Sequence, residues 1–133
     1  MISGFVAGHP RAWLRAEGLV TFIVATTLYG LTGGSWVLFA ALFFAPDLSF
    51  LGYLAGASAG AWTYNVAHSY AGPLIVVLAL LLMNNPVSLA LIWIAHIGFD
   101  RVLGYGLKYP TAFQDTHLGR IGKSRTAEPR ETR

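Results

Sequence analysis

The sequence contains no cysteine and few charged residues. The lack of cysteine excludes disulfide bonds and thiolate metal sites. Only 11% of the 133 residues are charged, whereas a soluble domain carries about a quarter. Between Glu17 and Asp100, the only formally charged side chain is that of Asp47. Because 55% of the residues are also hydrophobic, the composition predicts an integral membrane protein.

Three helix-breaking segments divide the apolar part of the chain, at residues 32–35, 52–60 and 84–86. The stretches between them are long enough for spans of about 20 residues each. We therefore predict an all-α membrane bundle of four transmembrane helices, at residues 14–31, 35–54, 61–83 and 87–107. Residues 1–119 are expected to form this domain, with a structured segment after the fourth helix. Residues 120–133 are expected to form a basic, disordered tail.

The basic residues predict the orientation in the membrane. Arg11 and Arg15 precede the first predicted helix, and the remaining basic residues lie at or beyond the end of the fourth. The positive-inside rule then places both termini in the cytoplasm, with the protein in the inner membrane. A cleaved signal peptide is the rival interpretation, but Glu17 interrupts it and no small-residue cleavage site follows. The basic tail is typical of a segment beside anionic lipid, and we expect no nucleic-acid partner.

The ionisable residues of the predicted helices all fall in the cytoplasmic half of the bundle. They are Glu17, Asp47, His68, His96 and Asp100. His96 and Asp100 are four residues apart and share one helix face, and Tyr64 and His68 repeat this spacing. Asn65 adds a further polar side chain to that helix. Buried charges in lipid are tolerated when they are paired or bound to a metal, so these residues are candidates for a common site.

Two histidines and two or three carboxylates form a suitable ligand set for zinc, or for manganese if oxygen ligands dominate. We predict four metal ligands, Asp47, His68, His96 and Asp100. Glu17 is expected to be either a fifth ligand or a general base. A bound ion would lower the pKa of a bound water molecule and make it a nucleophile.

Other polar residues near these ligands predict how a substrate is held. The candidates for substrate binding are Tyr64, Asn65, Arg101 and Lys108. The two cations could hold the phosphate of a lipid headgroup. Asp115 and His117 follow the fourth helix and could fold over the mouth of the site as acid and base groups. The residues thus predict a metal-dependent hydrolase of a membrane-associated phosphoester.

Four motifs also carry a resemblance to a known family. They are Ala45-Pro46-Asp47-Leu48-Ser49, Tyr64 to Tyr70, His96 to Pro110, and Phe113 to Gly119. Over about residues 13–122, the chain resembles the bacterial membrane family called domain of unknown function 4260. This resemblance implies a membrane protein and brings no known activity.

A second resemblance concerns the order of the polar motifs. Pro46-Asp47, then His68-Ser69, then His96 followed by Asp100 is similar to the layout of small membrane-bound metal-dependent hydrolases. That similarity implies ligand roles for the aspartates and histidines of these motifs. The chain departs from the pattern at Ser49, where a second aspartate would stand, and at Tyr64, where a further histidine would stand. The two replacements imply one metal ion rather than two, or none.

Other interpretations of the same residues stay open. The histidines could form only interhelical hydrogen bonds, Asp47 could cap a broken helix, and Arg101 and Lys108 could extend to the interface. Chains of Asp, Glu and His also serve proton conduction and solute transport, for which a homo-oligomer could supply a path. A third function is a non-enzymatic scaffold that retains the cluster for heme or an ion.

Overall fold

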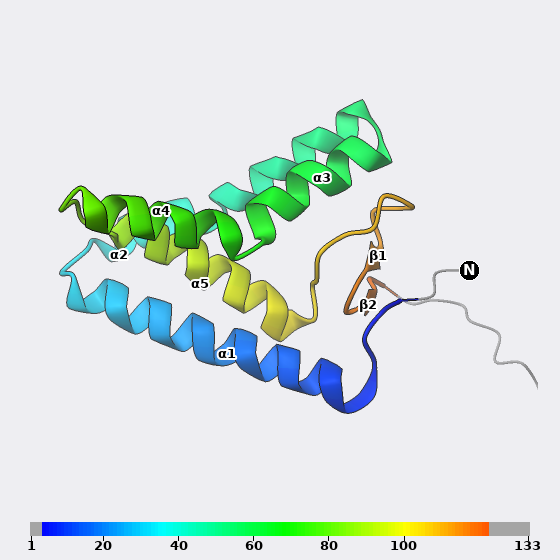
Figure 1. The fold of residues 1–133 in the computed structure, drawn as a ribbon, viewed down its shortest axis with the longest axis horizontal. Coiled ribbons are helices and arrows are strands. Elements are labelled where there is room, and N and C mark those ends of the chain that lie inside the picture. Colours follow the sequence, from blue (N-terminus) through cyan, green and yellow to red (C-terminus); the bar gives the residue numbers. More distant parts are fainter. Residues whose placement is uncertain (1–3, 123–133) are drawn as a thin grey trace, which may run out of the picture.

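The computed structural model describes residues 4–122, which form a helical bundle with one small hairpin (Figure 1). The elements in order are α1 (Gly8–Leu31), α2 (Trp36–Phe43), the 3-10 helix η1 (Ala45–Ala55), α3 (Ala57–His68), α4 (Ala71–Leu82), α5 (Ser88–Leu103), β1 (Asp115–Thr116) and β2 (Gly119–Arg120). The all-helical architecture is confirmed.

Two helical segments are long and apolar enough to cross a bilayer. They are α1 and the run Trp36–Ala55, which joins α2 to η1. The pair α3 and α4, bent by 42° at a short break, makes a third candidate if its halves form one span. Helix α5 has 16 residues, fewer than a usual span, and it is largely buried. These helices are typical of a membrane protein, with two or three candidate spans, and the four predicted spans are not confirmed.

The ends of the first and last helices differ from our prediction for clear local reasons. Helix α1 begins at Gly8 rather than at residue 14, since Pro10 is tolerated in a first helical turn. Helix α5 ends at Leu103 rather than at residue 107. Gly104 follows it with a φ of 87°, the left-handed conformation that ends many helices.

The second predicted helix changes character at its proline. Helix α2 ends at Phe43, and the chain continues from Ala45 as η1, with Pro46 in its first turn. Proline has no N–H to donate and its ring clashes with the preceding turn of an α-helix. This change of helix type sets the direction in which Asp47 leaves the backbone.

The third predicted helix, at residues 61–83, is in fact two helices. It breaks between His68 and Ala71, and Pro73 lies in the first turn of α4, where it cannot donate to the turn before it. Side chains of α5 bind the carbonyl groups that the break leaves free. Trp93 donates from Nε1 to the Ala67 carbonyl at 2.6 Å, and Arg101 donates from Nη2 to the His68 carbonyl at 2.7 Å. Such partners are required wherever a helix breaks within a membrane.

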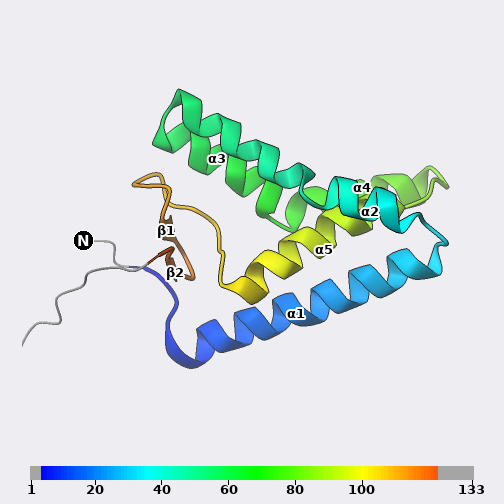
Figure 2. The same cartoon turned by 180° about the vertical axis from the view of Figure 1, so that it is seen from behind.

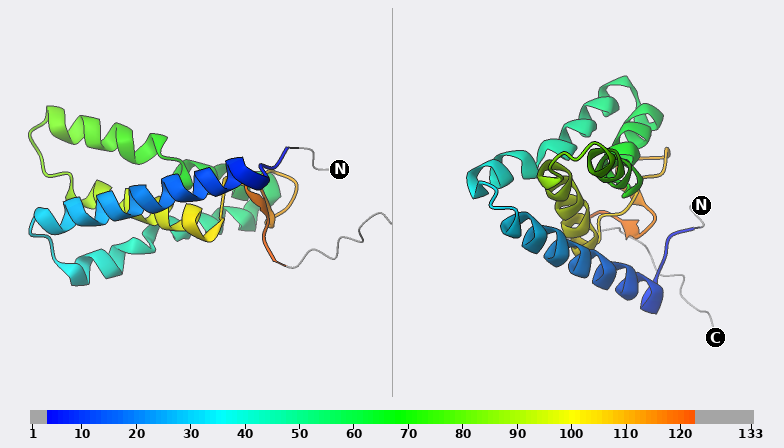
Figure 3. Two further views of the ribbon diagram at one scale, coloured as in Figure 1. Left: turned by 90° about the horizontal axis from the view of Figure 1, so that it is seen from below. Right: turned by 60° about the vertical axis from the view of Figure 1, so that its left-hand side comes forward.

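Helix α5 lies at the centre of the bundle, beside α1 in every view (Figures 1 and 2). Glycines permit this close approach, since a Cβ on Gly18 would lie 2.8 Å from the carbonyl oxygen of Gly98. Helices α2 and α4 flank α5 on opposite sides, as the view from below shows (Figure 3). The helix rich in ionisable residues is thereby shielded by its neighbours.

Helices η1 and α3 form a tight antiparallel hairpin. Gly56 makes the turn with a φ of 119°, a conformation that favours glycine. Gly52 and Gly60 lie against the side chains of Thr63 and Tyr53, respectively, where a Cβ has no space. The glycines thus allow the contact that brings η1 against α3.

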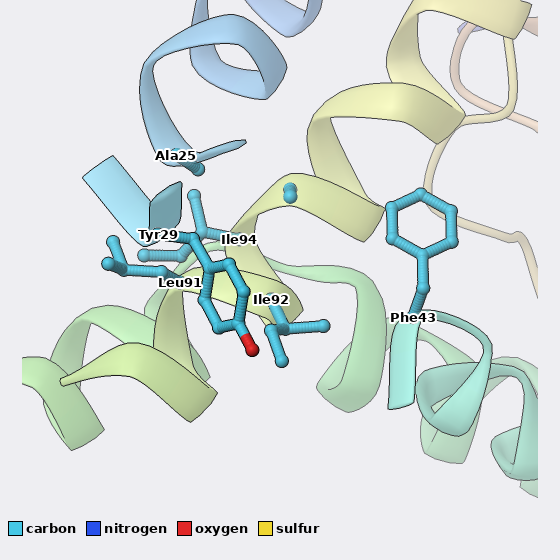
Figure 4. Close-up of a cluster of buried hydrophobic side chains, with 7 residues drawn as sticks. Ala25, Tyr29, Phe43, Leu91, Ile92 and Ile94 are labelled. Atoms are coloured by element: carbon cyan, nitrogen blue, oxygen red, sulfur yellow. The ribbon is translucent and has the colours of Figure 1, made fainter. Parts of the chain in front are cut away.

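The apolar core lies at the end of the bundle where α1, α2 and α5 meet (Figure 4). Its buried members are Ala25, Tyr29, Phe43, Leu91, Ile92, Ile94 and Ala95. Tyr29 satisfies its hydroxyl by donating to the Ser35 carbonyl at 2.7 Å. Many large apolar side chains on the other helices are exposed, as suits contact with lipid.

The segment after α5 folds back against the start of the chain. Its strands β1 and β2 pair antiparallel, with Asp115 opposite Arg120. The Val6 amide donates to the His117 carbonyl, and the Tyr109 hydroxyl donates to the Gly4 carbonyl at 2.7 Å. The predicted tail therefore begins within a strand, and its residues 123–133 lie outside the described part of the chain.

Candidate metal centre

Four side chains from three helices converge beside the break in the α3–α4 pair. Asp47 comes from the first turn of η1, and His68 is the last residue of α3. His96 and Asp100 come from one face of α5, four residues apart. Each offers one ligand atom, and these atoms all lie within 4.8 Å of one another. The structure thus brings together all four predicted metal ligands.

Five of the six separations between these ligand atoms are nearly equal. The two histidine Nε2 atoms are 3.1 Å apart. His68 Nε2 lies 3.3 Å from Asp47 Oδ1 and 3.4 Å from Asp100 Oδ2. His96 Nε2 lies 3.4 Å from Asp47 Oδ1 and 3.5 Å from Asp100 Oδ2. Tetrahedral zinc, with ligands at about 2.0–2.2 Å, requires ligand atoms about 3.3–3.5 Å apart. The five nitrogen–nitrogen and nitrogen–oxygen separations are close to this range, and the two aspartate oxygens lie within 4.8 Å of each other, so the four atoms surround a space for one ion.

The tautomer of His68 follows from its hydrogen bond. Its Nδ1 lies 2.9 Å from the Tyr64 carbonyl oxygen, which can only accept, so Nδ1 carries the proton. When the ring is neutral, the lone pair of His68 Nε2 points at His96 and at the two aspartates. A cation among these atoms is the simplest way to satisfy them. Nδ1 of His96 is buried without a hydrogen-bond partner in the described part of the chain.

Neighbouring residues orient the ligands from outside. The Tyr64 ring stacks on the His68 ring at 3.7 Å between centroids, and the Tyr64 hydroxyl lies 3.4 Å from Asp100 Oδ2. Arg101 donates to the carbonyl groups of His68 and Tyr105 and is itself buried. These contacts fix the end of α3, and with it the position of the His68 imidazole.

A cavity of about 320 Å³ opens onto the cluster. Its wall includes three of the four candidate ligands, Asp47, His96 and Asp100, and also Lys108. The rest of the lining is apolar or aromatic: Phe43, Phe44, Phe50, Tyr64, Phe99, Leu103, Tyr105, Phe113 and Ile121. A mostly apolar cavity with a few convergent polar groups is the usual form of a ligand site. We refer to it as the metal-side cavity.

Lys108 is the cation of this cavity wall. Its Nζ donates to the Phe113 carbonyl at 2.6 Å and lies 3.8 Å from the Phe113 ring centroid and 4.8 Å from that of Tyr64. Its burial lowers the pKa of this ammonium group to about 8. The aromatic rings hold the charge at the cavity by cation–π contacts.

The other predicted site residues lie apart from the four ligands. Asn65 binds the backbone of Lys108 through both polar atoms of its amide. Asp115 accepts from the Thr111 hydroxyl at 2.7 Å, and His117 accepts at Nδ1 from the Leu107 amide at 2.8 Å. The side chain of Glu17 is exposed on α1 and is not part of the cluster. The hydrogen bonds of Asn65, Asp115 and His117 hold the segment after α5 in place.

Our sequence reasoning missed the phenylalanines of the metal-side cavity. They come from the α2–η1 region, from α5 and from the segment before β1, so no periodic pattern joins them. The one sequence signal for this aromatic lining was the pair Phe43 and Phe44, which lies close to the predicted ligand Asp47.

No curated protein and no solved structure matches the chain. A family model, described as "Domain of unknown function (DUF4260)", matches residues 11–121. This match includes every residue of the candidate metal centre. Because it covers most of the sequence, the chain belongs to the DUF4260 family.

Proposed function

We propose that the protein binds one divalent transition metal ion through Asp47, His68, His96 and Asp100. The convergence of the four ligand atoms supports this proposal more than any other observation, since five of their six separations are 3.1–3.5 Å and all are within 4.8 Å. Two nitrogens and two oxygens at this spacing suit zinc, with manganese as the alternative for a site dominated by oxygen. Ser49 and Tyr64 stand where a second ion would need ligands, which favours a single ion.

We further propose that this centre is catalytic, in a hydrolase of membrane-associated esters or phosphoesters. Structural zinc sites are closed, whereas three of these ligands line a cavity large enough for a ligand. Bound there, a divalent ion polarises an ester or phosphoryl oxygen and lowers the pKa of water. Asp47 has a side chain 35% exposed, so it is the ligand most accessible from solvent.

The remaining polar groups have defined places in this proposal. Lys108 supplies a positive charge for an anionic headgroup, and Tyr64 orients Asp100 through its hydroxyl. Arg101 positions His68 by binding its carbonyl group rather than the substrate. Glu17, Asp115 and His117 could reach a substrate only if the mouth of the site rearranges.

We propose the inner membrane as the location, with both termini in the cytoplasm. The short α5 would then be a fourth helix inside the bundle, shielded from lipid by the candidate spans. The basic residues in the first half of α1, in the last turn of α5 and after α5 support this orientation. It would open the metal-side cavity toward the cytoplasmic surface of the bilayer.

The test is a hydrolysis screen on purified protein in lipid nanodiscs, with carboxylic and phosphate esters of lipids as substrates. We expect activity that chelation abolishes and that zinc or manganese restores. The matched variants are His96→Ala, which removes a candidate ligand, and His9→Ala, which removes an exposed histidine at the start of α1. Equal loss in both variants, or flux across liposomes that survives chelation, would contradict the hydrolase proposal.

A further inference from the structure

A second cavity adjoins the metal-side cavity. It measures about 300 Å³ and is lined by Phe22, Phe39, Ala40, Phe43, Phe44 and Phe99. Three of these residues, Phe43, Phe44 and Phe99, also line the metal-side cavity. The two cavities are therefore neighbours that share a wall of phenylalanine rings. We call the second one the phenylalanine cavity.

The two cavities differ in chemistry. Every residue that lines the phenylalanine cavity is apolar, whereas the metal-side cavity carries two aspartates, a histidine and a lysine. The phenylalanine cavity lies between α1 and α2, both candidates for membrane spans. Large apolar side chains are exposed on both helices, including Ile23 and Leu38. Its surroundings are therefore those of hydrocarbon rather than water.

We propose that the phenylalanine cavity binds the hydrocarbon chain of an amphiphile whose anionic headgroup lies at Lys108 and the metal centre. This inference rests on the proposed function and names its substrate class: a single-chain lipid ester or phosphoester. Apolar contact would hold the chain, and the charged groups would fix the head. In this arrangement, the part of the hydrocarbon chain next to the headgroup would contact the shared residues Phe43, Phe44 and Phe99.

The phenylalanine cavity gives one chain a place beside the metal-side cavity. A third cavity, lined by residues that include Leu42, Pro46 and Trp93, shares no lining residue with the metal-side cavity. It lies on the other side of the α2–η1 segment, next to Ala67 of α3. A second chain from the same headgroup would have no comparable adjoining cavity there.

The test uses photo-crosslinking in nanodiscs with a single-chain alkyl phosphate that carries a diazirine near its methyl end. Ala40→Trp fills the phenylalanine cavity without touching a metal ligand. Ala41→Trp is the matched control, because Ala41 is also exposed on α2 but does not line this cavity. We expect mass spectrometry to find the label on residues 36–44, with severalfold loss in Ala40→Trp and no loss in Ala41→Trp.

Two competitors separate the chain from the head. An unlabelled alkyl phosphate of the same length should reduce labelling, and glycerol phosphate at the same concentration should not. Labelling that is equal in the two tryptophan variants, or spread evenly over the exposed faces of the helices, would overturn the inference. Metal is measured on the same samples. Its absence would refute the proposed function, whereas labelling insensitive to Ala40→Trp with metal present would refute only the chain site.

Discussion

His68 and His96 face each other through their Nε2 atoms at 3.1 Å, although they come from two different helices. Both side chains are buried, and a neutral His68 presents its Nε2 lone pair there because its other ring nitrogen donates to a carbonyl group. Two aspartate oxygens lie beside the same pair. This arrangement of acceptors around one point is the basis of the metal proposal and of the predictions below.

Arg101 is expected to act as a positioning residue for the metal centre. Arg101→Lys cannot reproduce the donation to both His68 and Tyr105, so α3 should lose its fixed end. Metal affinity should fall by about 10–100-fold, the usual effect of losing an outer contact. Calorimetric zinc titration measures this. Arg120→Lys, at a largely exposed side chain, is the control, and equal affinity in parent and Arg101→Lys would contradict the assignment.

Asn65 is expected to hold the segment after α5 against α3. Its Oδ1 accepts from the Lys108 amide at 2.6 Å, and its Nδ2 donates to the Lys108 carbonyl at 2.8 Å. Asn65→Ala leaves both backbone groups without a partner, at a cost of about 1–3 kcal/mol each if they stay buried. Faster hydrogen exchange at the Lys108 amide should report this. The exposed Asn85→Ala should leave that amide protected.

Gly18 is expected to be required for the contact between α1 and α5. A Cβ there would press on the Arg101 side chain and on the Gly98 carbonyl, so Gly18→Ala should destabilise the fold by about 1–3 kcal/mol. Gly30→Ala in the same helix meets only the Trp36 ring, which is exposed and can move. Thermal unfolding in detergent compares the two variants. An equal or higher midpoint for Gly18→Ala would show that the helices do not pack as described.

His117 is expected to make the segment after α5 sensitive to acid. Burial, with a smaller effect from the Arg101 charge, lowers the pKa of its imidazole below the usual 6.5. The folded state therefore binds this proton less well than the unfolded state, so the contribution is complete above pH 6.5 and is lost as the pH falls below it. Protonation of Nδ1 also removes the acceptor for the Leu107 amide.

Hydrogen exchange at the Leu107 amide, corrected for its intrinsic pH dependence, tests this expectation. Its protection should decrease as the pH falls, and the exposed His9→Ala variant should behave like the parent. Constant protection across this range would mean that His117 does not control the segment.

The sequence was sufficient to predict the helical membrane class and the approximate helix positions, because both depend on apolar length and on local breakers. The breakers at residues 32–35 and 84–86 lie between helices as predicted, whereas the end of α5 at Gly104 was missed. The break after His68 was not predicted, although Pro73 signals it. That break is stable only because Trp93 and Arg101, distant in the sequence, bind its carbonyl groups. Tertiary contacts of this kind leave no local pattern.

The four candidate ligands were predictable because charge and imidazole are so rare in the apolar stretches that each one stands out. The surrounding residues were harder to assign. Asn65 and Arg101 were expected to bind substrate, but both side chains form hydrogen bonds with backbone carbonyl and amide groups. A polar side chain beside a site can bind a ligand or the backbone, and only the folded position distinguishes the two.

The most direct measurement is elemental analysis of three purified proteins. They are the parent, a double variant that combines His96→Ala with Asp100→Ala, and the control His9→Ala. All three are first matched for helix content and for size in detergent. The account predicts stoichiometric zinc or manganese in the parent and in the control, and none in the double variant. Metal absent from all three after growth with added zinc and manganese, or equally present in the double variant, would contradict the metal centre.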